Sequence, residues 1–155
     1  MRWLWLMVFY LGCNVSSVAK ATVAIRDNNA HARFGRMIVA AETVKPDQRE
    51  KYMERRAQWG ASIQIADSEV LGMNMPTKDE AVAFIRVSWY RLETGELRLT
   101  TIKQRWREVK DDWMLVAEER ADGDIGLLGE HVEVLAPKEP HVNAQFPSVH
   151  LGSTD

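Results

Sequence analysis

Asp67 and Glu69 are the side chains best placed in this sequence to act as a general base. They alternate with apolar residues in the stretch 63–70. A carboxylate that projects from a strand into an apolar pocket has a raised pKa and can accept a proton near neutral pH. Asp67 followed by Ser68 is also favourable turn chemistry, and an exposed bend is the simpler interpretation. We therefore expect no catalytic residue.

Metal coordination is the second chemistry to consider. The histidines are His31, His131, His141 and His150. Their spacing fits no metal-binding motif. Asp122, Asp124 and Glu130 are close in sequence, but they lack the glycine and the alternating ligands of a calcium loop. Cys13 is the only cysteine, so one chain can form neither a disulfide nor a cysteine-based metal site. We expect no metal and no cofactor.

Residues 81–121 contain the strongest structural pattern, and we expect three consecutive antiparallel strands there. Apolar and polar residues alternate with period two, and β-branched and aromatic types are abundant. Thr94-Gly95 predicts a two-residue hairpin turn, and Lys110-Asp111-Asp112 predicts the next turn. In the resulting register Ala83 is opposite Trp106.

One face of this predicted sheet is almost continuously apolar, so we expect it to pack on helices. Trp106 should be among the most buried residues. The amide of Gln104 would hydrogen-bond a ligand or a backbone group. If a pocket for a small apolar ligand remains between the helices and the sheet, its predicted lining is Ile85, Val87, Trp89, Ile102, Gln104 and Trp106.

The opposite face is basic at one end and apolar at the other. The basic side chains are Arg86, Lys103, Arg105 and Arg107. They form either a docking patch for an acidic partner or, more simply, a solvated face neutralised by nearby glutamates. The apolar side chains are Tyr90, Leu92, Leu97 and Leu99. Such a cluster is typical of an interface, which predicts a homodimer or an envelope protein partner; coverage by residues 132–135 is the alternative.

The first residues have the composition of an export signal. Arg2 precedes an apolar run, 3–12, that is too short to cross a bilayer as a helix. Ala19-Lys20-Ala21 has the form of a cleavage site, which predicts a signal peptide over 1–21. Alternatively, Leu11-Gly12-Cys13-Asn14 resembles a bacterial lipobox, in which Cys13 is lipidated. Both interpretations predict the periplasm or cell envelope, with membrane attachment only through Cys13.

Charge argues against a nucleic-acid partner. The whole chain has a net charge of −2, and loss of residues 1–21 would make it more negative. Between this segment and the strands we expect a polar approach, 22–32, and two helices. The first would bury a stripe of Phe34, Met37, Ile38 and Ala41. The second would run from Pro46 to Gly60 with Tyr52 inward.

A further strand is expected over 62–75, and the loop that follows it over 75–79. Ile125, Leu127 and Leu128 would cover the open end of the core. The proline-rich residues 129–155 read as an extended or disordered tail. The folded domain would therefore cover 22–128.

This order of elements is that of an α+β roll, a bent antiparallel sheet of about four strands on two helices. Over about residues 34–121 the chain resembles the NTF2-like, cystatin-related superfamily. The resemblance depends on Pro46-Asp47-Gln48-Arg49, on Ile63-Gln64-Ile65-Ala66-Asp67, on Ala83-Phe84-Ile85-Arg86-Val87, and on Gln104-Arg105-Trp106 followed by Asp112-Trp113-Met114-Leu115. These are core and turn residues, so no functional residue of the superfamily is carried over.

That superfamily includes ketosteroid isomerases, polyketide cyclases, non-catalytic ligand binders and periplasmic assembly subunits. Our leading interpretation is a non-catalytic binding or assembly module at the cell envelope. The alternative is a carrier or an enzyme that uses the helix–sheet cavity for a small apolar molecule. Asp67 inside that cavity would favour the enzyme.

Overall fold

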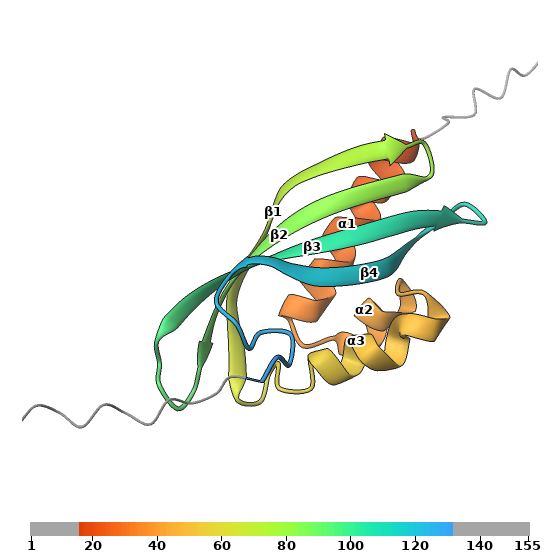
Figure 1. Cartoon of the computed structure of the whole chain (residues 1–155). Helices are drawn as coiled ribbons and strands as arrows, with labels where there is room; N and C mark the ends of the chain where they lie inside the picture. The colour runs from red at the N-terminus through yellow and green to blue at the C-terminus, as the bar shows by residue number, and fades with distance from the viewer. Residues whose placement is uncertain (1–15, 132–155) are drawn as a thin grey trace, which may run out of the picture.

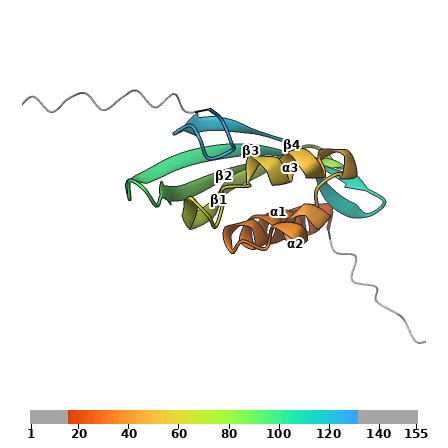
Figure 2. The same ribbon diagram turned by 90° about the horizontal axis from the view of Figure 1, so that it is seen from below.

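A four-stranded antiparallel sheet carries the helices of this protein on one side, which confirms the α+β class (Figure 1). The computed structural model describes residues 16–131. Residues 1–15 of the proposed export signal, with Cys13, and the tail beyond residue 131 with His141 and His150 lie outside this range, whereas residues 17–21 of that signal belong to α1. The strands lie in the order β1-β2-β3-β4, and α1 and α2 lie to one side of them (Figure 2).

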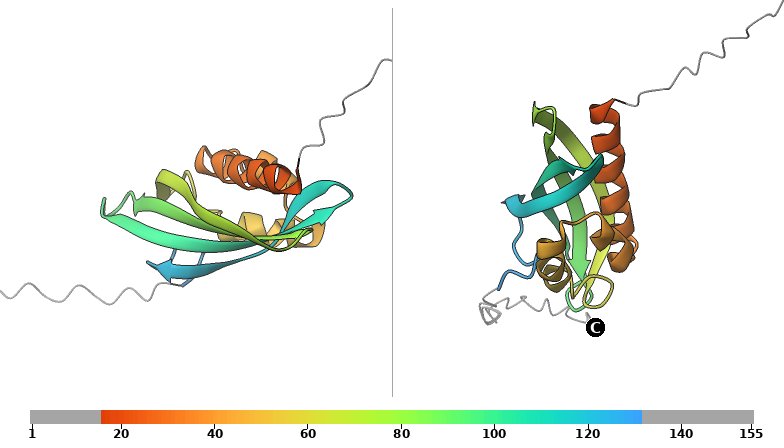
Figure 3. Two further views of the ribbon diagram at one scale, coloured as in Figure 1. Left: turned by 90° about the horizontal axis from the view of Figure 1, so that it is seen from above. Right: turned by 90° about the vertical axis from the view of Figure 1, so that its right-hand side faces the viewer.

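The helices are α1 (Ser17–Arg33), α2 (Met37–Glu42), the 3-10 helix η1 (Pro46–Gln48) and α3 (Arg49–Arg55). The strands are β1 (Ile63–Thr77), β2 (Glu80–Arg91), β3 (Leu97–Val109) and β4 (Asp112–Gly123). Two further views show how the long strands twist while α1 crosses them (Figure 3).

Helix α1 is the largest departure from the sequence-based expectation, because residues 22–32 are helical and form no linker. The hydroxyl of Ser16 accepts a hydrogen bond from the Ala19 amide at 3.3 Å and caps the helix. The polar residues Asn28 and Asn29, which suggested a linker, are buried on its inner face. The Asn28 Nδ2 atom donates to the Ala40 carbonyl at 2.7 Å. Specific hydrogen bonds thus compensate the burial of polar groups that no apolar pattern could predict.

The expected apolar stripe over 34–41 is correct only in part, because Ala41 is buried and Met37 packs against the core, whereas Phe34 and Ile38 are exposed. Phe34 is 66% exposed and Ile38 is 76% exposed, while Ala40 and Ala41 are the buried residues of α2. Gly35 has a φ of 71°, so the chain turns between α1 and α2, and the helical phase starts again after it.

The second predicted helix begins at Pro46, as expected, and buries Tyr52. It ends at Arg55 and not at Gly60. Gly60, with a φ of 79°, belongs to the turns that lead into β1, and its amide donates to the Ile63 carbonyl at 2.8 Å. The following strand is longer than predicted. It includes Thr77, which pairs with Glu80, so most of the loop expected over 75–79 is part of β1.

The register between β2 and β3 differs from the predicted one by two residues. Trp106 is opposite Ala81 and not Ala83, because residues 92–96 connect the strands in place of a two-residue turn. An even shift leaves every side chain on its own face, so the predicted inner face is retained. The next turn matches the prediction: Lys110 and Asp111 have positive φ, and Asp112 pairs with Val109.

Candidate ligand-binding cleft

The six side chains predicted to line a pocket lie together on the inner face of the sheet. Each is at most 2% exposed, and the five apolar ones belong to one core with the buried face of α1. The Trp89 indole also donates to the Thr100 hydroxyl at 2.9 Å. Leu127 and Leu128 are buried in the same core, whereas Ile125 is 42% exposed. None of the six lines the cavities described below.

Gln104 joins the sheet to α1 through side chains. Its Oε1 atom accepts from Asn29 Nδ2 at 3.0 Å, and its Nε2 atom donates to Asn29 Oδ1 at 3.1 Å. Trp106 Nε1 donates to the same Gln104 oxygen at 3.3 Å. This closed amide pair explains a glutamine in an apolar core, and its partner is neither a ligand nor the backbone.

A buried ion pair is the polar feature that sequence reasoning missed. Both terminal nitrogens of Arg56 donate to the Glu118 carboxylate of β4, and the Nη2–Oε2 distance is 2.7 Å. The two side chains are only 1% and 6% exposed. The guanidinium lies 3.8 Å from the centroid of the Tyr52 ring and 4.9 Å from that of Trp59. Residues so far apart in sequence carry no local signal of their pairing.

The electrostatics of this pair make it a fixed structural unit. Burial opposes the charge of Arg56, but the Glu118 carboxylate outweighs this effect, so the pKa of the guanidinium is raised above its ordinary value. Burial also raises the pKa of the Tyr52 phenol. Both groups therefore keep their protons at neutral pH, and neither is suited to accept one.

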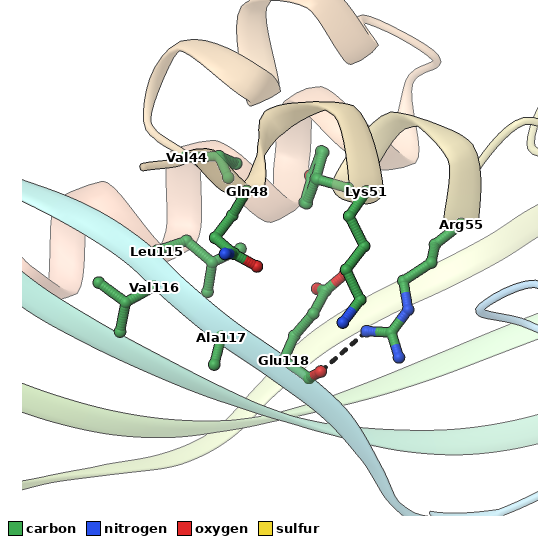
Figure 4. A pocket seen from close by; sticks show the side chains of 9 residues that line it. Val44, Gln48, Lys51, Arg55, Leu115, Val116, Ala117 and Glu118 are labelled. Atoms are coloured by element: carbon green, nitrogen blue, oxygen red, sulfur yellow. Dashed lines mark hydrogen bonds between the residues drawn. The ribbon is translucent and has the colours of Figure 1, made fainter. Parts of the chain in front are cut away.

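A small cavity lies beside this pair, between α3 and β4 (Figure 4). Gln48, Lys51 and Arg55 reach towards β4, and Arg55 donates to the Glu118 carbonyl at 2.8 Å. The volume of this small cavity is about 60 Å³. Ligand pockets usually enclose about 300–1,000 Å³, so this cavity has room only for about two water molecules.

A larger cavity opens where the first turns of α1, the end of α2 and the β3–β4 turn meet, and we name it the α1–β4 cleft. Its volume is about 640 Å³, which is typical of a ligand pocket. The lining residues are Ala19, Lys20, Val23, Ala24, Glu42, Thr43, Asp111, Asp112, Trp113 and Met114. Sequence reasoning missed it because Ala19 and Lys20 were assigned to a cleavage site and Trp113 to core packing.

The walls of the α1–β4 cleft are mainly apolar, and one polar group in them lacks a partner. Trp113 is 4% exposed, and its indole N–H is buried without a hydrogen bond in the part of the chain that is described. A buried donor left unsatisfied costs about 1–3 kcal/mol. The surrounding protein atoms enclose this N–H.

The other candidate residues lie away from this cleft. Asp67 has a side chain 62% exposed and forms an ion pair with Arg33 at 2.8 Å. Its carboxylate is therefore exposed, as the simpler interpretation predicts, but Asp67 lies within β1 and not in a turn. The side chain of Glu69 is 61% exposed and lies 4.0 Å from Arg86. Neither acid has the apolar environment that a general base would need.

Structural hydrogen bonds account for the acids that superficially suggested calcium. Asp124 accepts from the Leu99 amide at 2.9 Å, and Glu130 accepts from the Leu128 amide at 2.9 Å. Within residues 16–131, no group of three His, Cys, Asp or Glu side chains is arranged to hold a metal ion. His131 is exposed.

The outer sheet face has the two ends that the sequence indicates. Leu92, Leu97 and Leu99 are 59%, 63% and 50% exposed. At the basic end, Lys103 pairs with Glu119 at 3.2 Å and Arg107 with Glu80 at 2.6 Å, so acidic neighbours offset much of the charge. No helix within 16–131 has the length and apolar character required to cross a membrane.

Comparison with known proteins supports the fold class and nothing finer. No family model matches the sequence. No curated protein matches it either. The solution structure of a SEC-C motif-containing protein from Rhodopseudomonas palustris is similar, with a TM-score of 0.57 at 16% identity. The alignment covers 70% of this chain and 83% of that chain. At this identity the likeness concerns the α+β fold alone.

Proposed function

We propose that this protein is a non-catalytic binding module of the NTF2-like superfamily, exported to the cell envelope, that holds an apolar ligand in the α1–β4 cleft. The observation that carries the proposal is the α1–β4 cleft itself, a cavity of about 640 Å³ with mainly apolar walls. Apolar walls with a few polar groups are the usual composition of a ligand site.

The ionisable groups support binding over catalysis. The candidate bases Asp67 and Glu69 are on the exposed strand β1, away from the cleft. The buried Glu118 is held by Arg56. An enzyme would require an acid or base within hydrogen-bonding reach of a bound substrate. The acids that line the cleft, Glu42, Asp111 and Asp112, are exposed and lack the apolar surroundings that a general base needs.

Export remains supported by the composition of residues 1–12, and the structure bears on the processing site. Cleavage after Ala21 would remove the first turn of α1. It would also remove Ser17, whose hydroxyl donates to the Lys78 carbonyl at 3.1 Å, and the lining residues Ala19 and Lys20 of the α1–β4 cleft. Processing at Cys13 keeps all of these, so we favour a lipid-anchored domain.

The test is binding of N-phenyl-1-naphthylamine, a neutral apolar dye that becomes fluorescent out of water. We expect saturable binding by the domain from residue 14 onward, and at least tenfold weaker binding in Val23→Asp, because a carboxylate in an apolar wall is costly to desolvate. Val18→Asp is the matched control, since Val18 is on the same helix, similarly exposed (52% against 47%), and does not line the cleft. Equal binding by both variants would exclude this cleft.

Assembly through the outer sheet face is a second candidate function. The exposed Leu92, Leu97 and Leu99 favour it, because single apolar residues are common on surfaces but contiguous ones mark interfaces. Tyr90 pairs with Leu97 across the two strands and extends the cluster. The partner would be a second copy of the chain or another envelope protein.

A further inference from the structure

The charges around the α1–β4 cleft point to the chemistry of its ligand. We infer that the cleft takes a cationic amphiphile, a molecule with an apolar chain or ring system and a positively charged end. The inference rests on the proposed function, because it specifies the ligand of the same site.

The rim of the cleft is acidic. Its ionisable side chains are Glu42, Asp111, Asp112 and Lys20, three carboxylates against one ammonium group. In residues 16–131 none of the three carboxylates forms a salt bridge, although most other exposed acids of the sheet do. Unpaired charges of one sign beside an apolar wall attract a ligand of the opposite sign.

Two parts of the cleft match the two parts of such a ligand. Val23, Ala24 and Met114 supply apolar wall for the chain. The acidic rim attracts the positively charged end, and the Trp113 ring favours a nearby cation. Lys110 is next to Asp111 but does not line the cleft, so among residues 16–131 Lys20 is the one lining cation that opposes the ligand's charge.

The experiment compares three surfactants that share a twelve-carbon chain, each below its micelle concentration: dodecyltrimethylammonium, dodecyl maltoside and dodecyl sulfate. Displacement of the naphthylamine dye measures their affinities. We expect the cationic surfactant to bind on the order of tenfold more tightly than the anionic one, with the neutral one between. The difference should shrink as salt is raised, because the rim charges are exposed.

The decisive variant is Glu42→Gln/Asp111→Asn/Asp112→Asn. Asparagine suits position 111, where φ is 69°. The matched control neutralises three exposed acids elsewhere, Glu54→Gln/Glu93→Gln/Asp122→Asn, and changes the net charge by the same amount. We expect the cleft variant to lose the preference for the cation and to retain dye binding, and the control to keep both.

Each result has one meaning. A preference that survives in the cleft variant, or that is lost equally in the control, would overturn the cationic ligand while leaving the apolar site intact. Equal affinity of the wild-type domain for all three surfactants would do the same. If the wild-type domain binds neither the dye nor any surfactant, the proposed function itself fails.

Discussion

Trp106 shows how a single residue holds the two layers together. It is 1% exposed, lies opposite Ala81, and its indole donates to Gln104, which in turn pairs with Asn29 of α1. The sequence-based expectation that it is deeply buried is confirmed, although its cross-strand partner is different. Its side chain therefore contributes both apolar burial and one hydrogen bond to the contact between helix and sheet.

We expect Trp106→Ala to lower the free energy of unfolding by about 3–5 kcal/mol, since a large aromatic is removed from a packed core. Guanidinium unfolding of the domain measures this. Ile38→Ala is the control, because Ile38 is 76% exposed and belongs to α2, away from the outer sheet face, and its effect should remain within about 0.5 kcal/mol. A loss below about 1 kcal/mol at Trp106 would contradict the packing described above.

At the scale of elements, the Arg56–Glu118 pair fastens the end of α3 to β4. Removing one partner leaves a buried charge without its counter-ion, so we expect Glu118→Gln to cost about 3–5 kcal/mol of unfolding free energy. The double variant Arg56→Met/Glu118→Leu should lose clearly less unfolding free energy than the sum of the losses in Arg56→Met and Glu118→Leu alone. Additive losses in this double-mutant cycle, measured by denaturant unfolding, would show that the two side chains do not interact.

The sequence predicted those helices and strands whose signal lies within a few neighbouring residues. The alternation in β2 and β3 identified the inner face, and Pro46 marked the start of a helix. Helix α1 was missed because Asn28 and Asn29 are buried through hydrogen bonds to groups far away in sequence. The predicted pairing of β2 with β3 was wrong by two residues, because it assumed a two-residue turn at Thr94-Gly95. Residues 92–96 together connect the two strands.

The α1–β4 cleft was unpredictable for a related reason. Three separate elements form it, and one of them, the start of α1, contains the sequence pattern of a cleavage site. The sequence shows that Trp113 is a tryptophan in a predicted strand, but it does not show whether the indole N–H has a hydrogen-bond partner. Only the tertiary structure shows that the N–H lacks a partner.

For the whole molecule, the exposed leucines of the outer face predict self-association. We expect the domain from residue 14 onward to sediment as a dimer and Leu97→Glu/Leu99→Glu to sediment as a monomer, because two carboxylates would be desolvated at the contact. Sedimentation velocity over a concentration series measures this. Val18→Glu, at a similarly exposed valine of α1, should remain dimeric. A monomeric wild type would exclude a homodimer through this face.

Strand β1 has a consequence for behaviour at high concentration. It is an edge strand of 15 residues, and such an edge normally offers free amides and carbonyls to the strand of another molecule. Its pairing with β2 is interrupted three times, Pro76 has no amide hydrogen, and Asp67 and Glu69 place charge along it. These irregularities oppose edge-to-edge fibril growth. At high concentration the protein would thereby resist aggregation through this edge while its outer sheet face stays available.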